Sequence, residues 1–295
     1  MAPGSGLISP LVVLVGETAS GKSATAVEIA ERCNGEIICA DSRTIYRGMD
    51  IGTAKPSSDD QRRIRHHGLD IRSPDERFTA AQFKQFALGA IDDISDRGKL
   101  PLLVGGTGLY VDAVLYDYQF REPGDPAMRA VLQNMDVETL QQKLHEQNIP
   151  LPANSRNPRH LVRALETKGE VLVRSLLRGN TMVLGLAIDR AQIISRIRSR
   201  VTAMLDLGLE AEVQALANTY GWDAPGMQAI GYREWRPYFD DGQTLAQTQE
   251  MITKSTNAYA KRQRTWFRRN NSIQWHINRE EILSSVVTYT TKLNK

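Results

Sequence analysis

The sequence is poor in cysteine and contains no long apolar run. Its two cysteines, Cys33 and Cys39, have no histidine cluster nearby, which argues against a zinc site and predicts buried thiols in a reducing compartment. No segment approaches the ~20 apolar residues of a membrane-spanning helix, and residues 1–10 lack the charged and apolar regions of a secretion signal. We therefore expect a cytoplasmic protein with no membrane contact.

The sequence also carries little net charge. The net charge of the 295 residues is only +3, too small by itself to indicate a nucleic-acid-binding protein. The positions of the basic residues must therefore decide that question. Apolar residues make up 41% of the chain, enough for a packed core, and the length suggests about two domains.

What the sequence does contain is a phosphate-binding loop near its start. Residues 16–23 read Gly-Glu-Thr-Ala-Ser-Gly-Lys-Ser, between an apolar run typical of a buried strand, Leu11–Val15, and a helical pattern, Ala24–Cys33. In such a unit backbone N–H groups surround a phosphate, Lys22 adds positive charge and the Ser23 hydroxyl can hold Mg²⁺. The loop predicts a di- or triphosphate ligand without saying which one.

The apolar runs predict an α/β fold. Runs at Leu11–Val15, Glu36–Ala40 and Leu100–Val104 alternate with helical patterns, and a fourth, Met182–Ile188, comes much later. This alternation predicts a parallel sheet with helices on both faces, as in P-loop NTPases. The chain from residue 191 onward is expected to be mainly helical.

A proline-rich segment interrupts this pattern. It shows helical patterns at 127–147 and from Arg159 onward, but little strand-like sequence. We predict that residues 1–121 and 171–295 form a split α/β core, and that residues 122–170 form a small all-helical insertion domain. His66 and His67 lie in a charged stretch where we expect a loop and a structural role.

Polar residues follow two of the expected strands. Asp41 follows the second strand, and Thr107 lies among glycines after the third. Because the carboxyl ends of parallel strands line the ligand crevice, both are expected near the phosphate loop. Asp41 could hold Mg²⁺, act as a general base or simply cap the next turn, and Thr107 could donate to a phosphate oxygen.

Basic residues gather at particular places in the chain. The helix expected after Asp189 carries Arg196 and Arg200 on one face, where they could clamp a phosphate or simply be solvated. Lys254–Arg269 contains no acid and has aromatic residues between its basic ones, a pattern typical of nucleic-acid binding. A further basic cluster begins at Arg156. Together these features indicate an enzyme that handles both a polyphosphate and a polynucleotide.

Several blocks of the sequence resemble, in order, those of the tRNA dimethylallyltransferases, also called tRNA isopentenyltransferases. Besides the phosphate loop, these blocks are Asp41–Pro56, Leu102–Tyr110, Arg163–Glu166, Ile230–Arg233 and Ala260–Arg269. They extend over nearly the whole chain, and the blocks at Asp41–Pro56 and Ala260–Arg269 are far more specific than a phosphate loop. The family transfers a dimethylallyl group from its diphosphate to the exocyclic amine of the adenosine on the 3′ side of the anticodon.

The resemblance implies a role for each matching residue. Asp41 would be the general base on the adenine amine, and Thr107 would contact the bridging oxygen of the diphosphate. The implied diphosphate site, with Ser23 also the Mg²⁺ ligand, consists of Gly16, Thr18, Ala19, Ser20, Gly21, Lys22, Ser23, Arg196 and Arg200. The implied contacts with the tRNA anticodon stem-loop are Asp41, Ser42, Arg43, Thr44, Thr107, Arg129, Arg159, His160, Arg163, Gln228, Gly231, Tyr232, Arg233, Lys261, Arg262 and Arg264.

The sequence departs from the family pattern at two of these places. Glu17 stands where the family usually has proline, and we expect its side chain to point away from the phosphate. His160 stands where an arginine is usual. We expect a monomer that binds dimethylallyl diphosphate, Mg²⁺ and tRNA.

Two alternatives remain open from the sequence. An adenylate isopentenyltransferase acting on free adenine nucleotides would share the phosphate loop and Asp41 without needing the basic clusters, so those clusters favour tRNA. A P-loop nucleotide kinase or ATPase would instead use Asp41 to hold Mg²⁺.

Overall fold

The computed structural model describes residues 8–120, 125–170 and 173–293. Contacts within the chain divide it into two compact units, a core formed by 1–116 with 177–295 and an insertion formed by 117–176. The insertion thus starts earlier and ends later than the 122–170 expected from the sequence. The core boundaries expected at residues 121 and 171 lie outside the described residues.

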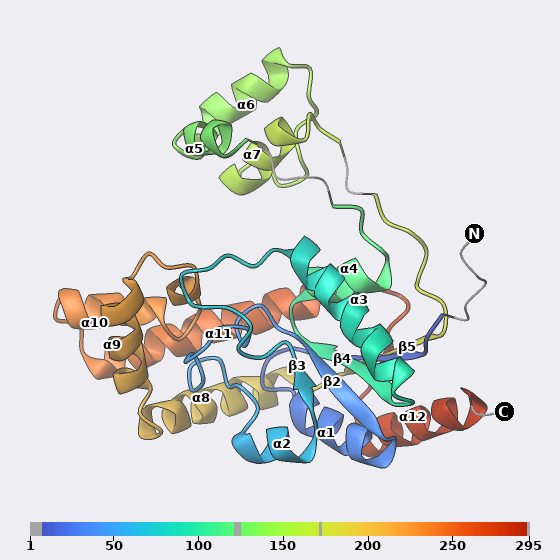
Figure 1. The fold of residues 1–295 in the computed structure, drawn as a ribbon. Helices are drawn as coiled ribbons and strands as arrows, with labels where there is room; N and C mark the ends of the chain where they lie inside the picture. The colour runs from blue at the N-terminus through green and yellow to red at the C-terminus, as the bar shows by residue number, and fades with distance from the viewer. Residues whose placement is uncertain (1–7, 121–124, 171–172, 294–295) are drawn as a thin grey trace. The chain divides into compact units, whose positions relative to one another are not determined.

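The core contains a parallel sheet with strand order β3-β2-β4-β1-β5-β6 (Figure 1). In the central pairings, Val13 of β1 lies opposite Leu103 of β4 and Val183 of β5. Strands buried on both faces give near-continuous apolar runs, which is why the central four could be predicted. The strands are β1 Leu11–Val15, β2 Gly35–Ala40, β3 His66–His67, β4 Leu100–Gly105, β5 Thr181–Leu186 and β6 Gln274–His276.

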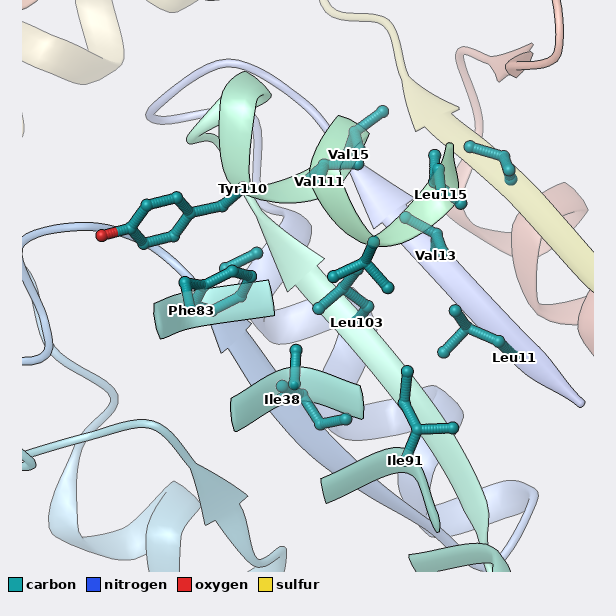
Figure 2. Packing of buried hydrophobic residues seen from close by; sticks show 14 of the residues in the cluster. Leu11, Val13, Val15, Ile38, Phe83, Ile91, Leu103, Tyr110, Val111 and Leu115 are labelled. Atoms are coloured by element: carbon teal, nitrogen blue, oxygen red, sulfur yellow. The ribbon is translucent and has the colours of Figure 1, made fainter. Parts of the chain in front are cut away.

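Helices cover both faces of the sheet, as the sequence predicted. On one face, alternate strand residues such as Leu103 pack against α3 (Ala80–Asp96) and α4 (Gly108–Leu115), and Figure 2 shows Ile91 and Tyr110 among these contacts. The intervening strand residues face α1 (Lys22–Arg32) and α12 (Arg279–Leu293). Because successive side chains of a strand point to opposite faces, one short strand contributes to both layers.

A second group of helices extends the core beyond the sheet. Its long members, α8 (Arg190–Asp206), α9 (Leu209–Tyr220) and α11 (Leu245–Phe267), pack around a buried cluster centred on Trp235. Side-chain caps define where two of them begin: Asp189 accepts from backbone N–H groups of α8, and Thr244 forms a capping box with α11. The short helices are α2 Ser58–Arg63, Gly226–Gln228, Arg233–Trp235 and α10 Arg236–Asp240.

Two local predictions were wrong. The expected loop at His66–His67 is a strand that pairs with β2, and His67 Nε2 lies 2.8 Å from a carboxylate oxygen of Glu36. The region after residue 191 is mainly helical, as expected, and contains one short strand, β6, at the edge of the sheet. The fourth strand ends at Leu186, before the expected Ile188. Strands of two or three polar residues are too short to show a hydrophobic period.

The insertion has its own small core. Its helices are α5 (Pro126–Gln133), α6 (Val137–Glu146) and α7 (Pro158–Glu166), so the single helix expected at 127–147 is broken in two. Asp136 accepts a hydrogen bond from the backbone of Thr139 and begins α6. Buried leucines of α6 and α7 form the centre of this unit.

Two backbone segments connect the units, and within each unit a hydrogen bond joins one segment to the other. Within the insertion, the N–H of Gln119 donates to the carbonyl of Val173 at 3.0 Å. Within the core, the N–H of Arg178 donates to the carbonyl of Leu115 at 2.8 Å. The last core residues before the insertion and the first after it are therefore held next to each other.

Candidate active site

The phosphate loop connects β1 to α1 with the curvature that an anion site needs. Ala19 and Gly21 have φ angles of 63° and 95°, a left-handed conformation that glycine adopts without strain. The loop ends at the first residues of α1, where backbone N–H groups are free to face an anion. The hydroxyl of Ser20 is buried and has no hydrogen-bond partner among the described residues. A phosphate oxygen would satisfy that hydroxyl.

Positive charge surrounds this loop. Removal from water, opposed in part by the carboxylate of Asp41, lowers the pKa of Lys22 to about 8. From α8, Arg196 donates to the carbonyl of Ser20 at 3.3 Å, and Arg200 donates to the Thr18 hydroxyl at 3.4 Å. Burial lowers the pKa of Arg200 as well. The structure therefore brings together all the residues that the sequence assigned to a diphosphate site.

Asp41 and Thr107 lie at the carboxyl ends of the neighbouring strands β2 and β4. Thr107 donates its backbone N–H to the carbonyl of Ala40 at 3.2 Å, and its hydroxyl accepts from the N–H of Ser42 at 3.1 Å. One carboxylate oxygen of Asp41 accepts from the N–H of Arg43 at 2.8 Å, whereas the other accepts no hydrogen bond from the residues that the structure describes. These bonds fix the direction of both side chains, as predicted from the strand ends.

Two cavities meet at Asp41. The larger, of about 250 Å³, is lined by residues of α11 and by Gln228 at the end of the short helix Gly226–Gln228, and the smaller, of about 80 Å³, is lined by Lys22 and Ser23. Apolar residues, including Ile37 and Val104, line part of the smaller one. The residues common to both cavities are Thr18, Asp41, Thr53, Ala54 and Arg200. Two different ligands, one in each cavity, could therefore reach the same carboxylate.

Most of the tRNA contacts expected in the core lie around the larger cavity. Those that line it are Asp41, Ser42, Arg43, Gln228, Gly231, Arg233 and Arg262, and Thr18 and Arg200 of the expected diphosphate set line it as well. Thr44 is buried and lines the smaller cavity instead. Lys261 is exposed on α11, and Arg262 lies over the ring of Tyr259, 5.6 Å from its centre.

Tyr232 does not occupy the position expected of a tRNA contact. Its side chain is fully buried in the core, and its hydroxyl donates to Glu212 at 2.6 Å. The same carboxylate accepts from the backbone N–H groups of Asp50, Ile51 and Gly52. Tyr232 and Glu212 thus support a wall of the larger cavity from behind. The sequence pattern does not reveal that Tyr232 is buried, because the turn at Gly231 determines which of the neighbouring side chains points into the core.

Arg264 is paired within the protein. Its guanidinium donates to the carboxylate of Glu17 with an Nη2–Oε1 distance of 2.6 Å, and the Glu17 side chain is only 8% exposed. The residue that replaces the usual proline of the loop therefore has a specific partner on α11. This guanidinium is held at the phosphate loop rather than extended from the surface.

In the insertion, the expected tRNA contacts differ in their availability. Arg129 donates from Nη2 to Glu166 at 2.6 Å, and the Glu166 side chain is only 3% exposed, so this arginine fixes α5 to α7. Arg163 lies 3.5 Å from the same carboxylate. Arg159 and His160 are exposed at the start of α7. Of this group, these two are the most accessible to a nucleic acid.

Comparison with known proteins assigns the chain to a family. The family model described as IPP transferase matches residues 44–270. The tRNA dimethylallyltransferase of Anoxybacillus flavithermus is 41% identical over 90% of this chain and 89% of the relative, and that of Bacillus subtilis is 39% identical over 90% of each. The chain belongs to the tRNA dimethylallyltransferase family.

Solved structures of this family share the fold. The tRNA isopentenylpyrophosphate transferase of Bacillus halodurans aligns with a TM-score of 0.74 and 35% identity, covering 96% of this chain and 97% of that one. A eukaryotic dimethylallyltransferase described as acting on tRNA aligns with a TM-score of 0.71 over 88% of this chain, and its 24% identity shows the fold alone. Membership confirms that this chain is a prenyltransferase of the tRNA-modifying class, as the sequence resemblance implied. Among the helices that the structure describes, none is long and apolar enough to cross a membrane.

Proposed function

We propose that this chain transfers a dimethylallyl group from dimethylallyl diphosphate to the exocyclic amine of the adenosine on the 3′ side of the tRNA anticodon. The observation that supports this most directly is the position of Asp41 between two cavities of different character. The smaller cavity joins a cationic phosphate loop to apolar walls, which suits an allylic diphosphate. The larger cavity is open and partly basic, which suits a base swung out of an RNA loop.

The cationic groups of the loop act on the leaving group. As the bond between the allylic carbon and the diphosphate oxygen breaks, negative charge grows on the diphosphate. Lys22, Arg196 and Arg200 would counter that charge, and the Ser20 hydroxyl would donate to it. The apolar side chains nearby exclude water from the allyl group, which has cationic character during transfer.

Magnesium suits the same site. The Ser23 hydroxyl stands where a phosphate loop holds Mg²⁺, and Mg²⁺ takes its remaining ligands from phosphate oxygens and water. Among the described residues no group of three or more His, Cys, Asp or Glu side chains could hold a metal ion, in keeping with a metal bound mainly through the substrate. Bound Mg²⁺ would supply further positive charge to the diphosphate.

Asp41 would take the proton from the amine. The exocyclic nitrogen of adenine is a poor nucleophile because its lone pair is delocalised, so a carboxylate must accept its proton as the N–C bond forms. The free oxygen of Asp41 is available for this task, and Thr107 is fixed beside it through Ser42. The products are the prenylated adenosine, diphosphate and a protonated Asp41.

The basic residues around the larger cavity and in the insertion would bind the anticodon stem-loop. Arg43, Arg233 and Arg262 line the cavity, and Arg159 and His160 are exposed in the insertion. We infer a monomer, since one chain contains both cavities. We also propose a cytoplasmic location, where tRNA is abundant.

Labelled dimethylallyl diphosphate tests this proposal when it is incubated separately with tRNA and with AMP. We expect label in tRNA only, at the adenosine after the anticodon. Asp41→Asn should lower the turnover number at least ~100-fold, the scale of general-base catalysis, while tRNA affinity stays within about twofold. Asp223→Asn, at a carboxylate that is 95% exposed, is the matched control. Label in AMP alone, or full activity of Asp41→Asn, would contradict the proposal.

A further inference from the structure

One buried side chain of α11 connects the two catalytic loops. Gln263 is only 4% exposed. Its amide oxygen accepts from the backbone N–H of Thr18 in the phosphate loop at 2.8 Å, and its amide nitrogen donates to the carbonyl of Gly106 at 2.9 Å. Gly106 directly precedes Thr107. A single amide therefore spans the loop after β1 and the loop after β4.

The amide of Gln263 occupies the space that any side chain at position 106 would need. A Cβ built on Gly106 would lie 2.1 Å from the amide nitrogen of Gln263, which no real contact tolerates. Loop and side chain are thus fitted to each other. The next residue of α11, Arg264, binds Glu17, so two successive residues of the helix hold two successive residues of the phosphate loop.

We propose that Gln263 is a positioning residue that fixes the distance between the diphosphate loop and Thr107. This inference rests on the proposed function for the identity of the two loops' ligands. The two loop contacts of Gln263 are both with backbone groups, so it would act on the ligands through the loops that hold them. Only a group that both accepts and donates can make these two bonds, which explains why an amide stands here.

The same helix also faces the larger cavity. Tyr259, one turn before Gln263, lines that cavity together with Arg262. Burial raises the pKa of Tyr259 to about 12, and hydrogen bonds of its hydroxyl with Thr107 and Gln263 oppose this rise. The helix proposed to contact RNA is therefore the element that also sets the spacing of the leaving-group loop.

Two substitutions at Gln263 and one control test the inference. Gln263→Ala removes both hydrogen bonds, and Gln263→Glu keeps the acceptor for Thr18 but turns a second acceptor toward the carbonyl of Gly106. Gln249→Ala removes a single side-chain bond, to Thr202, from the same helix far from the loops. Turnover number, tRNA affinity, pyrophosphate affinity and thermal stability are measured for each variant.

We expect Gln263→Ala to lower the turnover number about 100-fold, as for reacting groups displaced by ~1 Å, with pyrophosphate affinity falling and tRNA affinity unchanged. The turnover number of Gln263→Glu, taken relative to wild type, should rise as the pH falls from 8 to 5.5, because a protonated carboxyl both donates and accepts hydrogen bonds. Taking the ratio to wild type at each pH cancels the titration of groups that the two proteins share. Gln249→Ala should retain full activity.

Unchanged turnover and pyrophosphate affinity in Gln263→Ala would overturn the inference. So would a loss that the Gln263→Glu variant shows equally at every pH, because a general packing defect would not respond to protonation. Wild-type protein that prenylates no RNA would refute the proposed function. In that case the pyrophosphate affinities of wild type and Gln263→Ala would still decide whether Gln263 positions the loop.

Discussion

Replacing Arg264 with methionine should destabilise the core, because it leaves the carboxylate of Glu17 buried without its partner. The guanidinium contacts this carboxylate through Nε at 2.8 Å and through Nη2 at 2.6 Å. Methionine keeps much of the side chain's apolar length, so the change mainly removes charge and hydrogen bonds. The ammonium of Lys22, which lies near Glu17, is then the nearest remaining cation of the phosphate loop.

The size of the effect follows from burial. Removing one partner of a buried ion pair typically costs about 3–5 kcal/mol. The Arg264 side chain is 22% exposed, so water relieves part of the cost, and we expect a loss of about 2–3 kcal/mol. For a chain of this length that corresponds to a fall in Tm of roughly 5 °C. Glu17→Gln combined with Arg264→Met should recover at least ~1 kcal/mol of the loss, giving a clear coupling energy.

Urea and thermal unfolding of the two single variants and the double variant, without ligand, measure this coupling. Arg268→Met, at an exposed arginine at the end of α11, is the matched control and should stay within about 0.5 kcal/mol of wild type. If the loss of unfolding free energy in the double variant equals the sum of the losses in the two single variants, the reasoning about the ion pair is refuted. Arg264→Met could instead lose tRNA affinity, with a lower salt dependence and no recovery of affinity in the double variant. That result would show that Arg264 contacts RNA.

Other predictions concern charge and burial. Pyrophosphate affinity should fall as the pH rises through about 8, where Lys22 loses its proton, and calorimetry in buffers of different ionisation enthalpy should show proton uptake that Lys22→Met lacks. Arg129→Ala should destabilise the insertion by about 2–3 kcal/mol, because the buried carboxylate of Glu166 then keeps only its longer contact with Arg163. Arg159→Ala should leave the unfolding free energy unchanged and lower the salt slope of tRNA binding by ~1. Tyr232→Phe should cost about 1 kcal/mol in urea unfolding and leave tRNA affinity unchanged.

The parts of the fold that could be predicted are those whose signal is local. The run at Leu11–Val15, the glycines of the loop and the helical pattern after Lys22 each follow from a few neighbouring residues, and β1 and α1 begin there. β3 and β6 were missed because pairing with an existing sheet edge, rather than any period in their own residues, makes them strands.

The candidate site divides in the same way. Asp41 and Thr107 could be placed because strand ends in a parallel sheet lie at one edge. The partner of Glu17 could not, since Arg264 is 247 residues away and only tertiary packing brings them together. The burial of Tyr232 likewise depends on Glu212, which belongs to no motif. Gln263 lies within a matching block, but its two backbone partners come from distant loops.

The join between core and insertion has an evolutionary consequence. Leu115 and Arg178 are hydrogen-bonded to each other inside the core, so the two ends of the interruption already meet. A short linker could replace residues 117–176 without moving β5 or the catalytic edge of the sheet. The insertion is in this sense an exchangeable cassette: its length and sequence can change without disturbing the sheet edge that carries Asp41 and Thr107.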